Sequence, residues 1–309
     1  MKNKWLLGNL LLILTAMIWG MAFAFQRKGM ESIEPLTFTA VRMVLAAIVI
    51  GVTALISRSR EKRNSSSLTP EEEKIRSKNT ILGGICCGIF LAAASLFQQI
   101  GMVSTSAGKA GFITAMYILL VPIVNSILFK KKNHWLVWLA VLISIAGMYL
   151  LCMTEGFRLA HGDMLICLCA VMFCGQILCC DYFVKFGDPI QISAIQILTC
   201  AVISVIVAIL TKKSSLEQIH SAVIPILYCG IMSCGVGYTL QMVAQKFTDP
   251  TIASLLMSFE AVFAVIGGAL LLNEHMTSRE LLGCFVMFAA IILVQIPSPD
   301  EKKIRTPES

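Results

Sequence analysis

The sequence predicts an all-α integral membrane protein whose ten transmembrane helices form two inverted repeats of five helices each. Three observations lead to this prediction: an apolar composition, ten apolar segments of membrane length, and a weak match between the two halves of the chain. Of the 309 residues, 57% are hydrophobic and 14% are charged, whereas a soluble domain carries roughly 25% charged residues. Almost no sequence remains for a soluble domain.

Ten apolar segments follow one another along the chain, and most have the ~20 residues that a helix needs to cross a ~30 Å hydrocarbon core. The first follows two lysines, as a signal peptide would, but its apolar run is longer than the core of such a peptide. We therefore interpret it as a membrane span. The ten segments are Leu6–Phe25, Pro35–Ile56, Ile81–Met102, Gly108–Phe129, Trp135–Met153, Asp163–Phe183, Ile190–Leu210, Ala222–Ala244, Thr251–Leu272 and Glu280–Ile296.

The distribution of lysine and arginine predicts the orientation of the helices. With the N-terminus in the cytoplasm, 17 of these residues fall on the cytoplasmic side, 7 fall outside, and Arg42 lies inside a span. Cytoplasmic loops of membrane proteins are enriched in positive charge. The chain is therefore expected in the cytoplasmic membrane with both termini in the cytoplasm, and its net charge of +7 requires no nucleic acid partner. The polar residues 57–79 are expected to form a flexible cytoplasmic loop.

An internal repeat relates the two halves of the chain. A shift of 154 positions aligns Gly8 with Gly162, and a shift of 143 positions aligns Gln98 with Gln241. The difference of 11 falls in the polar loop between the second and third helices. We divide the chain into a first repeat, residues 1–154, a second repeat, residues 155–296, and a cytoplasmic tail, residues 297–309. Because each repeat has five spans, the second copy is inverted in the membrane, as in many transporters.

Glu260 is a carboxylate near the middle of the apolar stretch Thr248–Glu274. A charged group in hydrocarbon costs about 2.5–3.5 kcal/mol on insertion scales, so its position needs an explanation. In helical projection its own side carries mostly small residues, namely Ala253, Met257, Ala261, Ala264 and Gly268. The opposite side carries bulky residues expected to face lipid: Leu255, Phe259, Val262, Phe263, Ile266 and Leu270. Glu260 is thus either a buried, protonated structural carboxyl or a substrate or proton site.

Three further polar side chains are candidates for the same interior site. Trp19 lies about fourteen residues into the chain's first span, so it is either an interfacial anchor or part of a cavity wall. Gln98 and Gln241 occupy equivalent positions in the third and eighth helices. They either bind a polar ligand together or form hydrogen bonds between helices.

Two tyrosines complete the set of predicted cavity residues, and two cations remain ambiguous. Tyr117 is the repeat equivalent of Glu260, and Tyr238 lies on the same helix face as the second of the two glutamines. Arg42 lies about 10 Å into the second span, where it either reaches toward the interface or pairs with a carboxylate. Lys109 begins the fourth helix, as an interfacial anchor or as a gate that attracts anions.

Cysteine and histidine offer no metal or catalytic pattern. The twelve cysteines lie in the apolar segments or at their ends, without a CxxC motif or zinc-type spacing to histidine. The four histidines lie at loops or helix ends, and HExxH, GxSxG and nucleotide-binding motifs are absent from the sequence. We therefore expect no metal, no cofactor and no enzymatic activity. A membrane-embedded enzyme and a channel are remote alternatives, the latter because no continuous polar stripe is visible.

Several motifs carry a resemblance to a known family. The chain resembles the drug/metabolite transporter superfamily, specifically ten-helix permeases with two EamA-type repeats, over nearly its whole length. Two departures are visible: Ala261 stands where proline often follows the glutamate, and Lys130–Lys132 replaces the acidic residue that often ends the fourth helix. The motifs are Ala16–Phe23, Glu34–Ala47, Thr105–Ile123, Gly162–Phe173, Thr248–Glu274 and Glu280–Leu293, the last two being the most specific.

The resemblance implies a secondary transporter for a small organic solute, commonly an amino acid or related metabolite and often exported. It implies a cavity near the bilayer centre, lined by the first, third, fourth, sixth, eighth and ninth helices. Alternating access by rocking of the two repeats would move the solute. Glu260 would then either pair with a substrate ammonium group or exchange protons and couple transport to the proton gradient. Efflux of drugs or cationic compounds is the alternative; the sequence leaves the substrate, direction and oligomeric state open.

Overall fold

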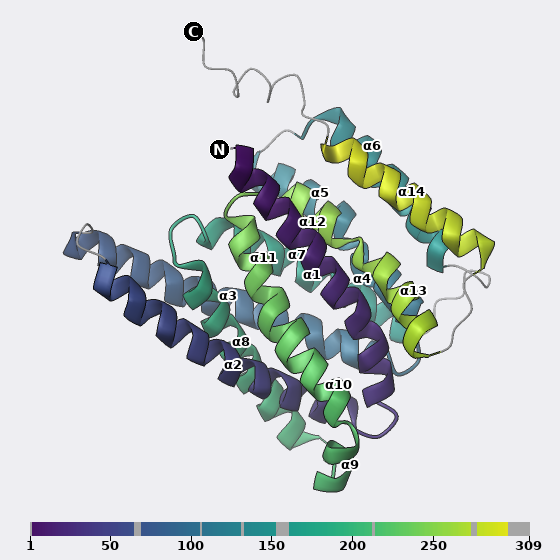
Figure 1. Ribbon diagram of the computed structural model, residues 1–309, viewed down its shortest axis with the longest axis horizontal. Coiled ribbons are helices and arrows are strands. Elements are labelled where there is room, and N and C mark those ends of the chain that lie inside the picture. The colour runs from purple at the N-terminus through teal and green to yellow at the C-terminus, as the bar shows by residue number, and fades with distance from the viewer. Residues whose placement is uncertain are drawn as a thin grey trace.

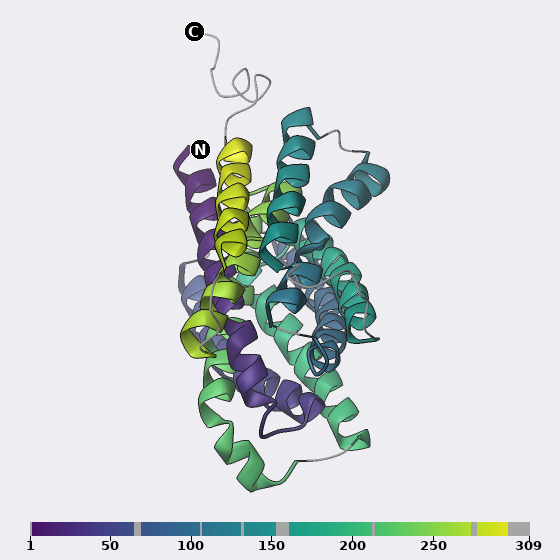
Figure 2. The ribbon, with the colours of Figure 1, turned by 90° about the vertical axis from the view of Figure 1, so that its right-hand side faces the viewer.

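The computed structural model describes residues 2–64, 69–105, 107–130, 133–152, 161–211, 214–272 and 277–295. Within these ranges all regular structure is helical. Figure 1 shows the helices packed side by side, and Figure 2 shows that α1 starts at the same end of the molecule at which α14 finishes. The predicted tail, residues 297–309, lies outside the described residues.

The helices follow the predicted apolar segments closely. The first half contains α1 Lys2–Gly29, α2 Pro35–Asn64, α3 Pro70–Gly101, α4 Ala107–Ala115, α5 Tyr117–Phe129 and α6 Trp135–Cys152. The second half contains α7 His161–Phe183, α8 Pro189–Leu210, α9 Leu216–Ser221, α10 Val223–Leu227, the π-helix η1 Tyr228–Gly237, α11 Tyr238–Gln245, α12 Pro250–Met257, α13 Glu260–Leu271 and α14 Ser278–Gln295.

Length and hydropathy support a multi-pass membrane protein. Among the described residues, eight helical segments are long and apolar enough to cross a membrane. Two shorter apolar helices, Trp135–Gly147 in α6 and Leu281–Ala290 in α14, accompany them. The all-helical membrane architecture is therefore confirmed, while the count of ten spans stays a prediction.

The expected flexible loop over residues 57–79 is wrong for the described part of that segment. Helix α2 continues to Asn64, and α3 already begins at Pro70. Thr69 caps α3: its hydroxyl accepts a hydrogen bond from the Glu72 amide at 3.3 Å, and the Glu72 carboxylate accepts one from the Thr69 amide at 2.9 Å. The segment is rich in glutamate, lysine and arginine, which favour helices in water, and its capping box starts one.

Three predicted spans are interrupted rather than continuous. The fourth breaks between Ala115 and Tyr117, and the ninth breaks between Met257 and Glu260. At the breaks the backbone tightens, because the amide of Met116 donates to the carbonyl three residues earlier at 3.2 Å, as does that of Ala261 at 3.1 Å. The eighth span contains the ten-residue π-helix η1 between two α-helical pieces.

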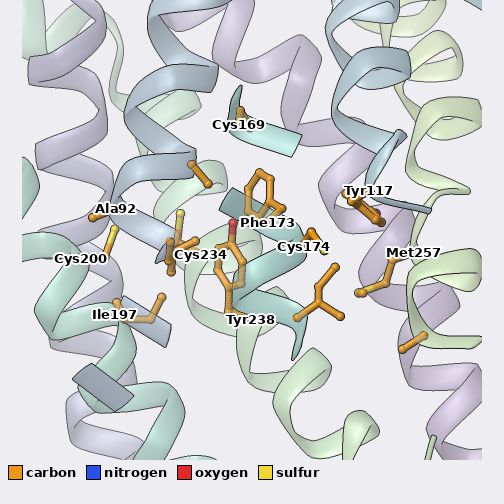
Figure 3. Packing of buried hydrophobic residues seen from close by; sticks show 14 of the residues in the cluster. Ala92, Tyr117, Cys169, Phe173, Cys174, Ile197, Cys200, Cys234, Tyr238 and Met257 are labelled. Carbon is orange, nitrogen blue, oxygen red and sulfur yellow. The ribbon is translucent and has the colours of Figure 1, made fainter. Parts of the chain in front are cut away.

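Helix α1 lies in the middle of the packing, against η1, α11, α12 and α13, whereas α3 packs against α7 and α8. Helices α6 and α14 form a pair at one edge of the molecule, visible in Figure 1. The largest hydrophobic cluster joins residues of both halves, and Figure 3 shows Tyr117, Phe173 and Tyr238 within it. The two halves therefore share one interior.

The α6–α14 pair changes the predicted lipid face of the ninth span. Leu270 is 69% exposed, as expected, but Leu255 and Val262 are buried. They belong to a hydrophobic cluster with Val141 of α6 and Met287 of α14. The prediction that these two residues face lipid was wrong. It assumed that protein covers only the side of the helix that carries Glu260, whereas α6 and α14 also cover part of the opposite side.

Candidate functional site

A polar cavity lies in the interior where both halves of the chain meet. Its volume is about 30 Å³, which is room for about two water molecules. All six predicted site residues line it: Trp19, Gln98, Tyr117, Tyr238, Gln241 and Glu260. Nine further residues complete the lining: Phe23, Gln26, Arg42, Thr114, Phe173, Gln176, Ile177, Ser233 and Cys234. The structure thus gathers the six residues, and a role in binding substrate stays a prediction.

Glu260 lies at the junction of the two interrupted spans. It begins α13, is 3% exposed, and its Oε1 accepts a hydrogen bond from the hydroxyl of Tyr117 at 3.1 Å. Tyr117 begins α5, so each residue directly follows a helix break. Helix α1 passes close to Glu260, because a Cβ atom on Gly20 would overlap the Glu260 carbonyl oxygen and Cβ of Phe263. Only glycine permits this approach at position 20.

Trp19 lies in the cavity wall rather than at a membrane interface. Its Nε1 donates a hydrogen bond to the backbone carbonyl of Ser233, in η1, at 3.1 Å. Its ring centroid lies 4.8 Å from that of Tyr238, with the two rings tilted by 50°. The first helix of one half and the interrupted span of the other are thus joined at the cavity.

The two equivalent glutamines form separate hydrogen bonds rather than one shared site. Gln98 Nε2 donates to the hydroxyl of Thr114, in α4, at 3.2 Å. Gln241 and Gln176, in α7, exchange amide hydrogen bonds of 3.1 and 3.2 Å. Each glutamine thus forms the predicted hydrogen bonds between helices and also lines the cavity, while the binding of a polar ligand by the two together stays a prediction. Gln176 was not anticipated, although it is the one amide side chain in the middle of its apolar helix and could have been found by that signal.

Arg42 is a cavity residue for which both sequence-based interpretations are wrong. It is 3% exposed, so it does not reach the membrane interface. Among the described residues it pairs with no carboxylate; its Nη1 donates to Gln26 Oε1 at 2.7 Å, and its Nε has no partner. Its guanidinium carbon lies 5.6 Å from the ring centroid of Phe38, a cation–π distance. The depth of Arg42 was readable from sequence, but the side chains around it were not.

The cavity therefore contains one buried acid and one buried base that do not pair. Arg42 and Glu260 both line it, yet no ion pair within 4.0 Å joins them in the described structure. A buried charge without a counter-charge is costly, so such a site favours a ligand that supplies one. Among the described residues, no group of three or more histidine, cysteine, aspartate or glutamate side chains could hold a metal ion.

Lys109 lies outside the cavity, at the end of the molecule where α4 and α7 begin. Its Nζ is 2.6 Å from Oδ2 of Asp163, which is fully buried. The other carboxylate oxygen of Asp163 accepts a hydrogen bond from the hydroxyl of Thr105 at 2.9 Å. Lys109 thus forms an ion pair between α4 and α7. It is therefore more than the simple interfacial anchor that was one prediction, and it is not the free anion-attracting cation that was the other.

Comparisons with known proteins agree over most of the chain. The profile of the EamA-like transporter family matches twice, over residues 6–153 and 160–296. An uncharacterized transporter of Archaeoglobus fulgidus is 26% identical over 293 residues, which cover 95% of this chain and 87% of that protein. The uncharacterized transporter YoaV of Bacillus subtilis is 20% identical, covering 91% of this chain and 94% of its own.

Two further comparisons concern a plant protein and the fold. A chloroplastic WAT1-related protein of Arabidopsis thaliana is 27% identical over 226 residues, which cover 68% of this chain and 54% of that protein. A solved crystal structure superposes with a TM-score of 0.74 at 16% identity, covering 99% of this chain and 100% of the other. At that identity the match establishes a shared fold.

Proposed function

The chain belongs to the EamA-like transporter family, and from this premise we propose that it is a secondary transporter of the cytoplasmic membrane that exports a small zwitterionic solute, an amino acid or a related metabolite, by alternating access. It is a transporter rather than an enzyme. The solute would bind in the polar cavity among Trp19, Gln98, Tyr117, Tyr238, Gln241 and Glu260, with Arg42 as an additional contact.

Equivalent contacts at opposite ends of the bundle support ten spans in two inverted repeats. The hydroxyl of Thr105 donates to Asp163 at 2.9 Å, and the hydroxyl of Thr248 donates to Asn9 at 3.1 Å. The shifts of 143 and 154 positions relate the first pair of residues to the second. Two copies of one arrangement, facing opposite ends of the bundle, are what an inverted repeat produces.

The cavity itself combines equivalent residues from both repeats, which supports a binding site between them. Eight lining residues form four equivalent pairs: Trp19 with Phe173, Phe23 with Ile177, Gln98 with Gln241, and Tyr117 with Glu260. Tyr117 and Glu260 are also in direct contact. Equivalent residues can touch only beside the axis that relates the repeats, and this is where transporters of this type bind substrate.

The observation that carries the proposed substrate class is the unpaired acid and base in one cavity. Glu260 can accept hydrogen bonds from an ammonium group, and the free Nε of Arg42 can donate to a carboxylate. A zwitterion therefore satisfies both charges, whereas a cation would leave Arg42 unpaired and repelled. The aromatic rings of Trp19, Phe173 and Tyr238 offer apolar contacts for a side chain.

The volume of the cavity supports alternating access. A space of about 30 Å³ is far below the ~300 Å³ at which small-molecule pockets begin. The cavity as described is too small for such a solute, which supports a cycle in which one end of the bundle opens before the solute enters. Motion of the two repeats about their common axis opens one end while it closes the other.

Orientation follows from charge and from the placement of the chain ends. The predicted cytoplasmic side carries 17 of the lysines and arginines and the external side 7. The start of α1 and the end of α14 lie at the same end of the molecule, which supports both termini in the cytoplasm (Figures 1 and 2). The charged pair of Lys109 and Asp163 then lies at the external end of the bundle.

Transport by purified protein in liposomes tests the proposal. We expect counterflow of at least one solute from a mixture of labelled amino acids, with liposomes lacking the protein as the control. Absence of counterflow for amino acids, amines and organic acids alike would contradict it. Efflux of cationic compounds is the alternative, because Glu260 alone suits a cation. Equal transport of an amine and of the corresponding amino acid would favour that alternative.

A further inference from the structure

Helix α3 is longer than a membrane core requires. Its 32 residues, Pro70–Gly101, extend about 48 Å, whereas the hydrocarbon core is ~30 Å thick. The apolar part of the helix begins at Ile81. The mostly polar residues from Pro70 to Thr80 therefore lie beyond the hydrocarbon, at the left edge of Figure 1.

A groove on one face of α3 crosses the boundary between the polar and the apolar part of the helix. Its volume is about 510 Å³, above the ~300 Å³ at which small-molecule pockets begin. The polar half carries two ammonium groups, and the apolar half carries three side chains that are 40–50% exposed. The lining residues recur at spacings of three and four, as one helix face requires, and they are Lys74, Ser77, Lys78, Ile81, Leu82 and Ile85.

Neighbouring aromatic residues place the membrane surface at the level of this boundary. A Cβ atom on Gly83 would lie 2.6 Å from Cβ of Phe183, so the end of α7 packs beside this part of α3. Tyr182 and Phe186, also near the end of α7, are 46% and 50% exposed. Exposed aromatic side chains are enriched where lipid headgroups meet hydrocarbon. The polar half of the groove therefore lies at the depth of the headgroups.

The two lysines of the groove differ from other cations nearby because they have no carboxylate partner. Arg76 of α3 forms an ion pair with Asp188 at 3.1 Å, and Lys185 of α7 is paired within its own helix at 2.6 Å. Lys74 and Lys78 form no ion pair within 4.0 Å in the part of the chain that the structure describes. Since they are four residues apart, their side chains are neighbours and can bind one phosphate together.

Three glutamates precede the lysines and complete the pattern of charge along α3. Glu71–Glu73 occupy the first turn, which is farthest from the hydrocarbon, and Glu72 is engaged in the capping box with Thr69. Glu71 lies about one turn before Lys74 on the same face. Toward the membrane, this face is therefore first negative, then positive and finally apolar. The positive charge is concentrated at the depth of the lipid phosphates.

We propose that this groove binds an anionic phospholipid, with the headgroup phosphate between Lys74 and Lys78 and an acyl chain along the apolar half. Basic side chains at a membrane surface attract anionic headgroups. The small side chain of Ser77 leaves the space between the two lysines open. A lipid occupies both halves of the groove, whereas a soluble anion would use the lysines alone. The inference requires only that the chain lies in a membrane, and it is independent of the proposed transport.

Lipid binding by the purified full-length protein in detergent tests this site. Phosphatidylglycerol is the anionic probe and phosphatidylcholine the zwitterionic one, and native mass spectrometry measures the fraction of protein that carries each. We expect the unmodified protein to prefer phosphatidylglycerol. The double variant Lys74→Gln, Lys78→Gln should bind phosphatidylglycerol about 25-fold more weakly, about fivefold for each lysine. Its binding of phosphatidylcholine should not change.

The matched control is the double variant Arg58→Gln, Lys246→Gln. Both side chains are exposed and belong to the predicted cytoplasmic cations, so the net charge changes equally but outside the groove. This control should bind phosphatidylglycerol as the unmodified protein does. Two single variants add independent tests. Ser77→Trp fills the groove without changing its charge and should weaken binding, whereas Glu71→Gln removes a negative charge near the lysines and should strengthen it.

The outcomes separate a lipid site from general attraction by charge. All the substituted side chains are exposed, so the unfolding midpoint without added lipid should stay constant. Weaker binding of phosphatidylglycerol in the double lysine variant and in Ser77→Trp, with normal binding in the control, supports the site. Equal losses in the lysine variant and the control, or unchanged binding in the lysine variant, would overturn it. Displacement of the lipid by inorganic phosphate at equal concentration would also overturn it, because the groove would then bind a soluble anion.

Discussion

The hydroxyl of Tyr117 donates a hydrogen bond to Glu260 across 3.1 Å and thereby joins the first residues of two helices, each of which directly follows an interruption in its span. A carboxylate held in this way is both buried and positioned. The contact therefore contributes both to the stability of the helical bundle and to the position of the carboxylate in the cavity. Separate substitutions of Tyr117 and Glu260 distinguish these two contributions.

Replacing Tyr117 with phenylalanine keeps the ring and removes the hydrogen bond. We expect the protein to lose about 1–2 kcal/mol of stability, because a buried carboxyl loses its donor. The midpoint of thermal unfolding in detergent measures this loss. Tyr182→Phe is the control, since Tyr182 is 46% exposed on α7 and its substitution should leave the midpoint unchanged. Equal midpoints for the two variants would argue against a structural contribution from this bond.

Glu260→Gln distinguishes the two roles proposed for the carboxylate. If Glu260 exchanges protons, the variant should transport with a flat pH profile. If Glu260 binds an ammonium group, the apparent affinity for an amine-bearing solute should fall at least about tenfold, the loss expected for one charge-assisted hydrogen bond. Proteoliposome uptake at several pH values measures both. An unchanged pH profile together with an unchanged affinity would exclude both roles; Glu217→Gln, on the exposed helix α9, is the control.

Arg42→Gln should reduce discrimination between an amino acid and the amine that lacks its carboxylate. We expect the preference for the amino acid to fall by about 10- to 100-fold, because the site loses its charged donor for the carboxylate. Competition of the two compounds for counterflow measures the ratio. An unaltered ratio in a folded variant would show that the carboxylate is recognised elsewhere or not at all.

Arg42→Met tests the same assignment through stability alone. A buried guanidinium that waits for a ligand is costly in the empty protein, and replacing such a charge with an apolar side chain is often neutral or stabilising. We expect the unfolding midpoint of the empty protein to stay constant or to rise. A clear drop would indicate that Arg42 serves mainly to join α2 to Gln26 of α1.

Gly20→Val tests how closely α1 approaches the cavity. The new side chain would overlap the Glu260 carbonyl and Phe263, so we expect a loss of about 1–3 kcal/mol from overpacking. Gly51→Val is the control, because a Cβ atom there meets nothing within 4 Å. The difference between the two unfolding midpoints is the measured quantity, and similar midpoints would mean that α1 can move away at little cost.

The helices and the group of cavity residues could be predicted from sequence because the hydrocarbon core of a membrane restricts both backbone structure and the placement of polar side chains. A polar side chain deep in a span must face protein, so depth alone brought Trp19, Gln98 and Glu260 into one set. The repeat then added Tyr117 as the equivalent of Glu260. These inferences need only the membrane thickness and the helical rise.

Other features left no such signal in the sequence. The breaks before Tyr117 and Glu260 arise from a small tightening of the backbone at ordinary residues such as Met116 and Phe259, which no side-chain pattern marks. The burial of Leu255 depends on where α6 and α14 pack, and that is a property of the assembled bundle. Whether Arg42 meets a carboxylate likewise depends on the side chains that face it across the cavity.

The pairing of an acid with a phenol has a consequence for the history of such a chain. In a symmetric dimer of two five-helix proteins, a residue beside the twofold axis faces its own copy. Glutamate would face glutamate there, and two carboxylates at that distance cannot both be ionised. Once duplication has joined the two copies into one polypeptide, each partner can mutate alone. Fusion thus permits a carboxylate to face a different side chain across the axis, here a phenol, which two separate identical chains could not encode.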